Sequence, residues 1–240
     1  MSFRIRCFLS HLFLSCMVGC LTAATVYGIW YPGALAKAVG VSHIFLLLLC
    51  IDVTVGPLLT LFLAKKGKKG LWFDLVTVVI LQFTALIYGV WHIAEGRPVW
   101  QVINIYRVEL VKAIDADYTH AQTLFAKNPL GKPGWAMVRP ARDKKETSDW
   151  IWLGLEKGKS PALRAELYQP IDGHWDEFSR EIQPLNKLGN YNIKKEVETV
   201  LAKYPEADGF LPMMGGEWDM TVLVSRKAQK ILGVVDLRPW

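Results

Sequence analysis

The sequence predicts a membrane protein in which three N-terminal transmembrane α-helices are followed by a periplasmic α+β domain with a C-terminal antiparallel hairpin. Two observations carry this prediction. Three long apolar runs fall within the first 94 of 240 residues, and the rest of the chain has the mixed composition of a water-facing domain. The mean hydropathy of +0.21 agrees, because it is too high for an ordinary soluble protein and too low for a pure membrane bundle.

The three apolar runs cover residues 8–30, 41–64 and 71–94. The first contains no Asp, Glu, Lys or Arg, and each of the others contains one acidic residue, Asp52 or Asp74. Each run exceeds the ~20 residues that a helix needs to cross about 30 Å of hydrocarbon. We therefore expect a three-helix transmembrane region over residues 1–94 and a separate domain over residues 95–240.

Basic residues around the apolar runs predict their orientation. Arg4 and Arg6 precede the first run, four lysines between positions 65 and 69 fill the turn between the second and third, and only Lys37 lies between the first and second. Because basic loops stay in the cytoplasm, we expect the N-terminus and the lysine turn inside the cell. An odd number of crossings then places residues 95–240 on the other side of the membrane, outside the cytoplasm.

The first helix leaves alternatives open. A cleaved signal peptide would also begin with basic residues and an apolar run, and Met17-Val18-Gly19-Cys20 has some features of a lipoprotein cleavage box. The apolar run continues to Trp30 without a clean small-x-small site, and Met17 replaces the usual leucine. We therefore favour a retained helix over either kind of processing.

The net charge of +6 does not indicate a nucleic-acid partner. Residues 1–94 hold seven basic and two acidic residues, whereas residues 95–240 hold 21 basic and 20 acidic residues. The positive surplus therefore flanks the apolar runs instead of covering a folded surface.

Chemistry-bearing motifs are absent from the sequence. All four cysteines lie at positions 7 to 50, so the domain has no disulfide scaffold and no thiol nucleophile. His120 and His174 lack metal-ligand spacing, and no P-loop, dinucleotide fingerprint or G-x-S-x-G occurs. We expect no enzymatic activity, no metal and no cofactor.

Asp52 is the residue of the apolar runs that most needs an explanation. It lies thirteen residues before Lys65, and Gln82 lies thirteen residues after Lys69, so both fall at a similar depth in the membrane. We expect a protonated Asp52 to hydrogen-bond Gln82 and to hold the second and third helices together. Gly56-Pro57 should kink the second helix or open a close-packing notch. The alternatives are contact with a partner helix and proton transport.

The domain is predicted to be α+β. Its clearest sheet is the hairpin of residues 220–225 and 230–237, and its clearest helix is 192–204, with Asn192 as the N-cap. The other expectations are an extended segment over residues 99–114, short strands over residues 135–138 and 210–214, helices over residues 117–127 and 146–157, and a helical stretch over residues 175–182.

Several short motifs resemble those of the TfpX/TfpZ-type type IV pilin accessory proteins. The first lies in the second apolar run, others follow in the third run and at the domain entrance, and the last two lie near the C-terminus. In order, they are residues 52–61 (DVTVGPLLTL), Phe73-Asp74-Leu75, Leu81-Gln82, Ala85-Leu86, Tyr88-Gly89, Gly96-Arg97-Pro98-Val99, Asp219-Met220-Thr221-Val222-Leu223 and Val235-Asp236-Leu237-Arg238-Pro239-Trp240.

The resemblance implies a non-enzymatic inner-membrane factor of Gram-negative bacteria that assists a cognate major pilin in pilus assembly and twitching motility. Its partners would be the major type IV pilin, inner-membrane lipid and other components of the assembly machinery. Candidate site residues fall into three sets. The intramembrane set is Asp52, Gly56, Pro57 and Gln82, the domain-entrance set is Arg97 and Pro98, and the C-terminal set is Asp219, Asp236, Arg238 and Trp240.

Other functions are compatible with the same architecture. A membrane-tethered periplasmic sensor or another partner-binding protein would share the architecture, but residues 1–7 and the lysine turn are too short for a cytoplasmic output domain. A transporter subunit would need several polar groups along a path, which three helices barely supply.

Overall fold

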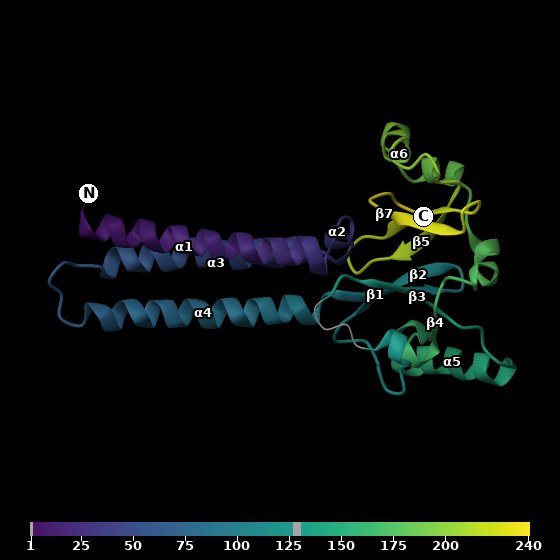
Figure 1. Cartoon of the computed structure of the whole chain (residues 1–240), viewed down its shortest axis with the longest axis horizontal. Coiled ribbons are helices and arrows are strands. Elements are labelled where there is room, and N and C mark those ends of the chain that lie inside the picture. The colour runs from purple at the N-terminus through teal and green to yellow at the C-terminus, as the bar shows by residue number, and fades with distance from the viewer. Residues whose placement is uncertain (1, 127–130) are drawn as a thin grey trace. The chain divides into compact units, whose positions relative to one another are not determined.

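The computed structural model describes residues 2–126 and 131–240, and it divides into two compact units. The helical unit comprises Met1–Ile29 and Val41–Gly96. The C-terminal unit comprises Arg97–Trp240 together with Trp30–Gly40, the segment between the first two long helices. Figure 1 labels most of the helices and strands of both units.

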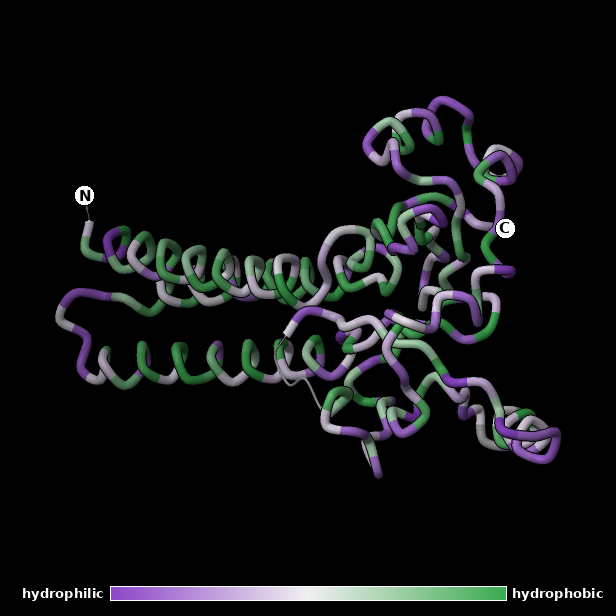
Figure 2. The backbone as a smooth tube through the Cα atoms, turned by 45° about the vertical axis from the view of Figure 1, so that its right-hand side comes forward, coloured by the Kyte–Doolittle hydropathy of each residue, from purple (hydrophilic) through white to green (hydrophobic). Residues whose placement is uncertain are grey.

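Three long helices form the helical unit. They are α1 (Phe3–Thr25), which continues into a π-helical turn (Val26–Trp30), α3 (Val41–Leu63) and α4 (Leu71–Glu95). All three are long and apolar enough to cross a membrane, which confirms the predicted fold class. Helix α3 packs against both α1 and α4, and hydrophobic residues dominate all three helices in Figure 2.

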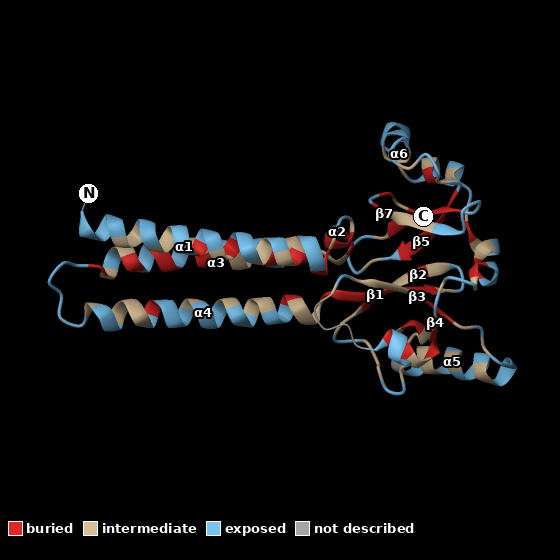
Figure 3. Cartoon of the chain, viewed as in Figure 1, coloured by how far each residue is buried: buried red, intermediate tan, exposed pale blue. Residues whose placement is uncertain are grey.

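Large apolar side chains cover the outside of these helices. Phe13 is 72% exposed, Phe62 70% and Trp72 79%, and exposed residues run along the whole length of each helix in Figure 3. Such a surface would be unfavourable in water, because burial of an aromatic or aliphatic side chain is worth ~1.5–3 kcal/mol. Lipid is the solvent that suits it.

The turn before α4 carries its own ion pair. Lys68 hydrogen-bonds Asp74, which lies in the first turn of α4. A carboxylate at that position also interacts favourably with the positive end of the helix dipole. One acidic residue of the third apolar run is thereby neutralised by the lysine turn.

The C-terminal unit is built on a curled seven-stranded sheet with the order β4-β3-β1-β2-β5-β6-β7. Neighbouring strands are antiparallel except β1 with β3 and β2 with β5. The strands are β1 (Pro98–Asn104), β2 (Arg107–Lys112), β3 (Gly134–Val138), β4 (Tyr168–Gln169), β5 (Gly209–Met214), β6 (Met220–Ser225) and β7 (Lys230–Val235). The helices are α2 (Leu35–Val39), α5 (Lys144–Lys157) and α6 (Lys194–Leu201).

Residues from the first interhelical segment belong to the core of this sheet. Leu35 and Ala38 of α2 are 2% and 0% exposed, and they pack in one cluster with Met213 of β5, Met220 of β6 and Phe178. A second cluster lies around Trp100, Phe125 and Tyr168, whose rings meet edge to face at centroid distances of 5.7–5.8 Å. The domain core therefore includes residues that precede α3 in the sequence and residues that follow α4.

The structure adds detail to one expectation for the domain and corrects another. The extended segment 99–114 is a hairpin of β1 and β2, turning at Ile105 with φ +58°. Within the described part of 117–127, which ends at residue 126, the structure shows turns and the 3₁₀ turn Thr123–Phe125 in place of a helix. Asp117 explains this, because its carboxylate accepts from Thr119 N at 2.9 Å and its backbone bridges Arg164.

Helix α5 begins with a charged capping arrangement. Asp143 is the N-cap and accepts from Glu146 N at 2.7 Å. Glu146 in turn accepts from Arg142 N at 2.6 Å and from both terminal nitrogens of Arg139, whose guanidinium lies 5.4 Å from the Trp150 ring centroid. The bonds from Arg139 and Arg142 lower the pKa of Glu146 from an ordinary value near 4.5 to about 2.

This pKa shift makes the stability of α5 acid-sensitive. Since the folded-state pKa lies below the unfolded value, ionised Glu146 stabilises the helix above about pH 5, and the contribution is lost as the pH falls toward 2. We expect Glu146→Gln to increase amide hydrogen exchange across α5 at pH 7, and the difference from wild type to shrink below pH 4. Glu156→Gln, the same charge change at the other end of α5, is the control. Equal exchange in both variants at pH 7 would contradict this account.

Candidate functional site

Asp52 and Gln82 meet between α3 and α4. Gln82 Nε2 donates to the backbone oxygen of Asp52 at 2.8 Å and to Asp52 Oδ1 at 3.2 Å. Asp52 is only 9% exposed, so the carboxyl group lies inside the bundle and not toward lipid. A glutamine amide thus bridges the main chain and the side chain of the same residue on the neighbouring helix.

Gly56 makes room for this bridge. A Cβ atom built at Gly56 would lie 1.9–2.0 Å from three atoms of the Gln82 amide group, so no other residue type fits without displacing it. Gly56 and the adjacent Pro57 are both buried within α3, which continues through them to Leu63. Small residues at such contacts let membrane helices approach closely. The four residues of the predicted intramembrane set therefore lie in one internal helix contact.

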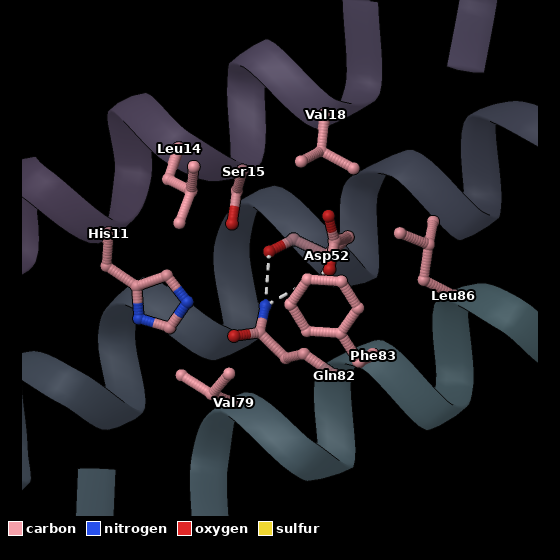
Figure 4. Close-up of a pocket in the computed structure, with 9 residues that line it drawn as sticks. All are labelled: His11, Leu14, Ser15, Val18, Asp52, Val79, Gln82, Phe83 and Leu86. Atoms are coloured by element: carbon pink, nitrogen blue, oxygen red, sulfur yellow. Dashed lines mark hydrogen bonds between the residues drawn. The ribbon is translucent and has the colours of Figure 1, made fainter. Parts of the chain in front are cut away.

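Helix α1 contributes polar groups of its own to the bundle. His11 Nδ1 is 2.6 Å from Thr60 Oγ1, which links α1 to α3. Ser15, on the same helix, is 6% exposed. Figure 4 shows His11 and Ser15 with Asp52 and Gln82 around one small cavity.

The domain-entrance residues pack against the end of the first helix. Arg97 is 6% exposed, and its guanidinium lies 5.8 Å from the ring centroid of Trp30. Burial lowers the pKa of Arg97 and raises the pKa of the neighbouring Tyr31, whereas the charge of Arg97 lowers that of Tyr31. Pro98 begins β1, and the Arg97 carbonyl accepts from Ala113 N at 2.9 Å. Residues 30 and 31 are therefore part of the domain entrance.

The C-terminal set gathers around Arg238. Its guanidinium donates to the backbone oxygen of Asp219 and to Asp236 Oδ1. Trp240 Nε1 donates to Asp219 Oδ2 at 2.7 Å. The same carboxylate accepts from Gly215 N at 3.0 Å through Oδ1. All four predicted residues of this set lie in one hydrogen-bonded cluster.

This cluster also holds the segment between the first two long helices. Lys37 Nζ is 2.7 Å from Asp236 Oδ2 and 5.7 Å from the ring centroid of Trp218. The backbone is paired as well, since the Ala38 carbonyl accepts from Glu217 N at 2.8 Å and from Trp218 N at 3.2 Å. Arg238 lies 5.3 Å from the Trp218 ring centroid. Side-chain and main-chain contacts together fix residues 37 and 38 on the domain.

Gly215 permits this close approach. A Cβ atom there would lie 1.9 Å from the backbone oxygen of Trp218 and 2.8 Å from that of Ala38. Backbone atoms cannot yield as a flexible side chain can, so glycine is required by the packing. The pair Gly215-Gly216 is thus a docking point for α2.

Asn192 does not have the role predicted for it. The N-cap of α6 is Ile193, and no side-chain cap is present there. The Asn192 amide instead donates to the backbone oxygens of Leu188 at 2.9 Å and Arg238 at 2.8 Å, and its Oδ1 accepts from Arg238 N at 2.7 Å. The side chain pairs with the C-terminal backbone, which cannot be inferred from local sequence.

Sequence reasoning missed several residues of these clusters. His11, Ser15 and Thr60 belong to the intramembrane set, and Lys37 and Trp218 belong to the C-terminal set. Lys37 carried a usable signal, because it is the only charged residue between positions 7 and 51. Over residues 2–126 and 131–240, no group of three or more His, Cys, Asp or Glu is placed to hold a metal ion.

Comparison with known proteins decides the family. A family model described as "Fimbrial assembly protein FimB" matches residues 1–40. The fimbrial assembly protein of Dichelobacter nodosus serogroups C1 and C2 is 34% identical over 107 residues, which cover 44% of this chain and 82% of that relative. The chain belongs to the fimbrial assembly protein family.

Other members of the fimbrial assembly protein family match nearly the whole chain. The serogroup I protein of Dichelobacter nodosus is 26% identical over 248 residues, covering 95% of this chain and 92% of the relative. The serogroup E1 protein is 25% identical over 251 residues, with the same coverage of both chains. No solved structure matches the chain.

We predict that Gly56→Ala weakens the α3–α4 contact by about 1–2 kcal/mol, because the new methyl group displaces the Gln82 amide from Asp52. The free energy of unfolding in lipid nanodiscs, measured by steric trapping, checks this. Gly28→Ala is the matched control, since nothing lies within 4 Å of a Cβ there. In the Gly56→Ala/Gln82→Ala double variant the clash is gone, so the two costs should not add. Additive costs would refute the proposed packing.

A second prediction concerns the attachment of residues 37 and 38. Arg238→Gln removes charge-assisted bonds worth ~1.5–3 kcal/mol each, so tryptic cleavage after Lys37 should become about tenfold faster or more. Cleavage of the purified chain, followed by mass spectrometry of the fragment that begins at Ala38, measures the effect. The exposed Arg180→Gln provides a control in the same domain. Equal cleavage rates in wild type and Arg238→Gln would show that the cluster does not hold this segment.

Proposed function

We propose that this protein is a non-enzymatic accessory factor that assists a cognate major pilin in type IV pilus assembly. The observation that carries the proposal is the near full-length similarity to fimbrial assembly proteins, together with three apolar helices and a folded C-terminal domain. The motifs that resemble the TfpX/TfpZ-type accessory proteins narrow the role to a pilin-specific helper.

The same proposal places the protein in the bacterial inner membrane, with the C-terminal domain in the periplasm. The lysine turn before α4 and the basic N-terminus support a cytoplasmic location for those parts. The packing of Trp30–Gly40 with Arg97–Trp240 adds an independent argument. These two segments are separated by α3 and α4, and they can share one compartment only if the α3–α4 hairpin crosses the membrane twice.

Within this topology, the protein would contact the pilin at two points. Asp52, Gly56, Pro57 and Gln82 are occupied with each other inside the bundle, so we propose that they shape the helices while lipid-facing residues touch the transmembrane segment of the pilin. Phe83, 51% exposed on α4 beside Gln82, is a suitable contact residue.

The domain half of the contact would use the surface around the C-terminal cluster. Trp218 and Trp240 are 48% and 46% exposed there, yet each is held by a cation–π contact or a hydrogen bond. A groove beside them, of about 780 Å³, is lined by Lys37, Tyr191 and Arg238 among others. Rigid, exposed aromatic residues next to arginine are typical of binding hot spots.

Photo-crosslinking in bacterial cells tests the proposal. Benzoylphenylalanine at Phe83 and at Tyr191, both exposed aromatic positions, should each yield a crosslinked product that contains the major pilin. The same probe at Lys66 in the lysine turn should yield none and is the matched control. Efficient crosslinks from Phe83 and Tyr191 to other proteins, with pilin absent, would overturn the pilin-specific role.

A further inference from the structure

A small cavity lies between α1, α3 and α4. Its volume is about 40 Å³, and its walls come from all three helices. Figure 4 shows the arrangement, with the Ser15 hydroxyl pointing toward Asp52 and Gln82 across the space. The lining residues are His11, Leu14, Ser15, Val18, Asp52, Val79, Gln82, Phe83 and Leu86.

One buried polar atom at this cavity lacks a partner. Gln82 Oε1 is buried and accepts no hydrogen bond within the described chain, because the amide uses only its nitrogen toward Asp52. Ser15, which is only 6% exposed, lines the same cavity. An unpaired buried polar group is destabilising, and lipid offers no substitute partner.

The size and chemistry of the cavity fit a water molecule. A cavity needs about 10–15 Å³ to hold one, together with two to four polar partners. The 40 Å³ here is sufficient, and Gln82 Oε1, the Ser15 hydroxyl and the Asp52 carboxyl group supply three partners. Most of the other lining residues are apolar, so the polar end of the cavity is the place where water can be held.

We propose that this cavity is an internal hydration site within the transmembrane bundle. A bound water donates to Gln82 Oε1, accepts from the Ser15 hydroxyl and hydrogen-bonds the Asp52 carboxyl group. It thereby connects α1 with both α3 and α4. Direct side-chain bonds already join α1 to α3 through His11 and Thr60, and α3 to α4 through Asp52 and Gln82, so the water completes the set of contacts.

Solid-state NMR of the purified full-length chain in deuterated lipid nanodiscs tests this site in the absence of any pilin. Magnetisation transfer from water to the Gln82 side-chain amide is expected in the wild type. Ser15→Val, which removes the hydroxyl and fills the space, should abolish the transfer. Ser10→Val, at an exposed position of the same helix, should leave it unchanged.

Absence of transfer in the wild type would show that the cavity is dry, or that its polar atoms wait for a side chain of a partner helix, and either finding overturns the proposal. Undiminished transfer in Ser15→Val would also overturn it. The wild-type measurement needs no variant, so the test stands even if Ser15→Val fails to fold.

Discussion

The docking of α2 on the C-terminal sheet is the constraint on which the rest of this structure depends. Leu35 and Ala38 supply core side chains to the sheet, and the Ala38 carbonyl pairs with two backbone amides of the loop before β6. The polar cluster around Arg238 then closes over this junction. Because Trp30–Gly40 is continuous with α1 on one side and α3 on the other, the chain passes between the helical unit and the C-terminal unit at three places instead of one.

The membrane architecture could be predicted from sequence because a bilayer imposes one length and one composition on every helix that crosses it. The hairpin of β6 and β7 could be predicted equally well, since two β-branched runs flank a short polar turn. The hairpin of β1 and β2 escaped notice because its turn at Ile105-Tyr106 contains no Gly, Asn or Pro. The place of α2 could not be inferred at all, because the backbone amides that pair with the Ala38 carbonyl belong to Glu217 and Trp218, far along the sequence.

The candidate sites also differ in whether local sequence or long-range packing determines their geometry. Counting residues from the lysine turn puts Asp52 and Gln82 at one depth, and the structure joins them by hydrogen bonds. No comparable count links His11 to Thr60, because the rotation of α1 about its axis is set by packing and not by spacing. For the C-terminal set, short sequence motifs identified the residues. Their arrangement in space depends on contacts between segments that are far apart in the sequence. Asn192 shows the difference, since helix-capping rules are local and its actual partner is 46 residues away.

The ion pair between Lys37 and Asp236 joins residues 199 positions apart, which has a consequence for synthesis. At 5–20 residues per second, a ribosome needs about 10–40 s to travel between them. During that interval Leu35 and Ala38 of α2 lack their core partners Met213 of β5 and Met220 of β6. Only a chain translated beyond β6 contains all of these partners. The fold thus couples the segment between α1 and α3 to strands made near the end of synthesis, and a prematurely terminated product would display an uncovered apolar segment that proteases can recognise.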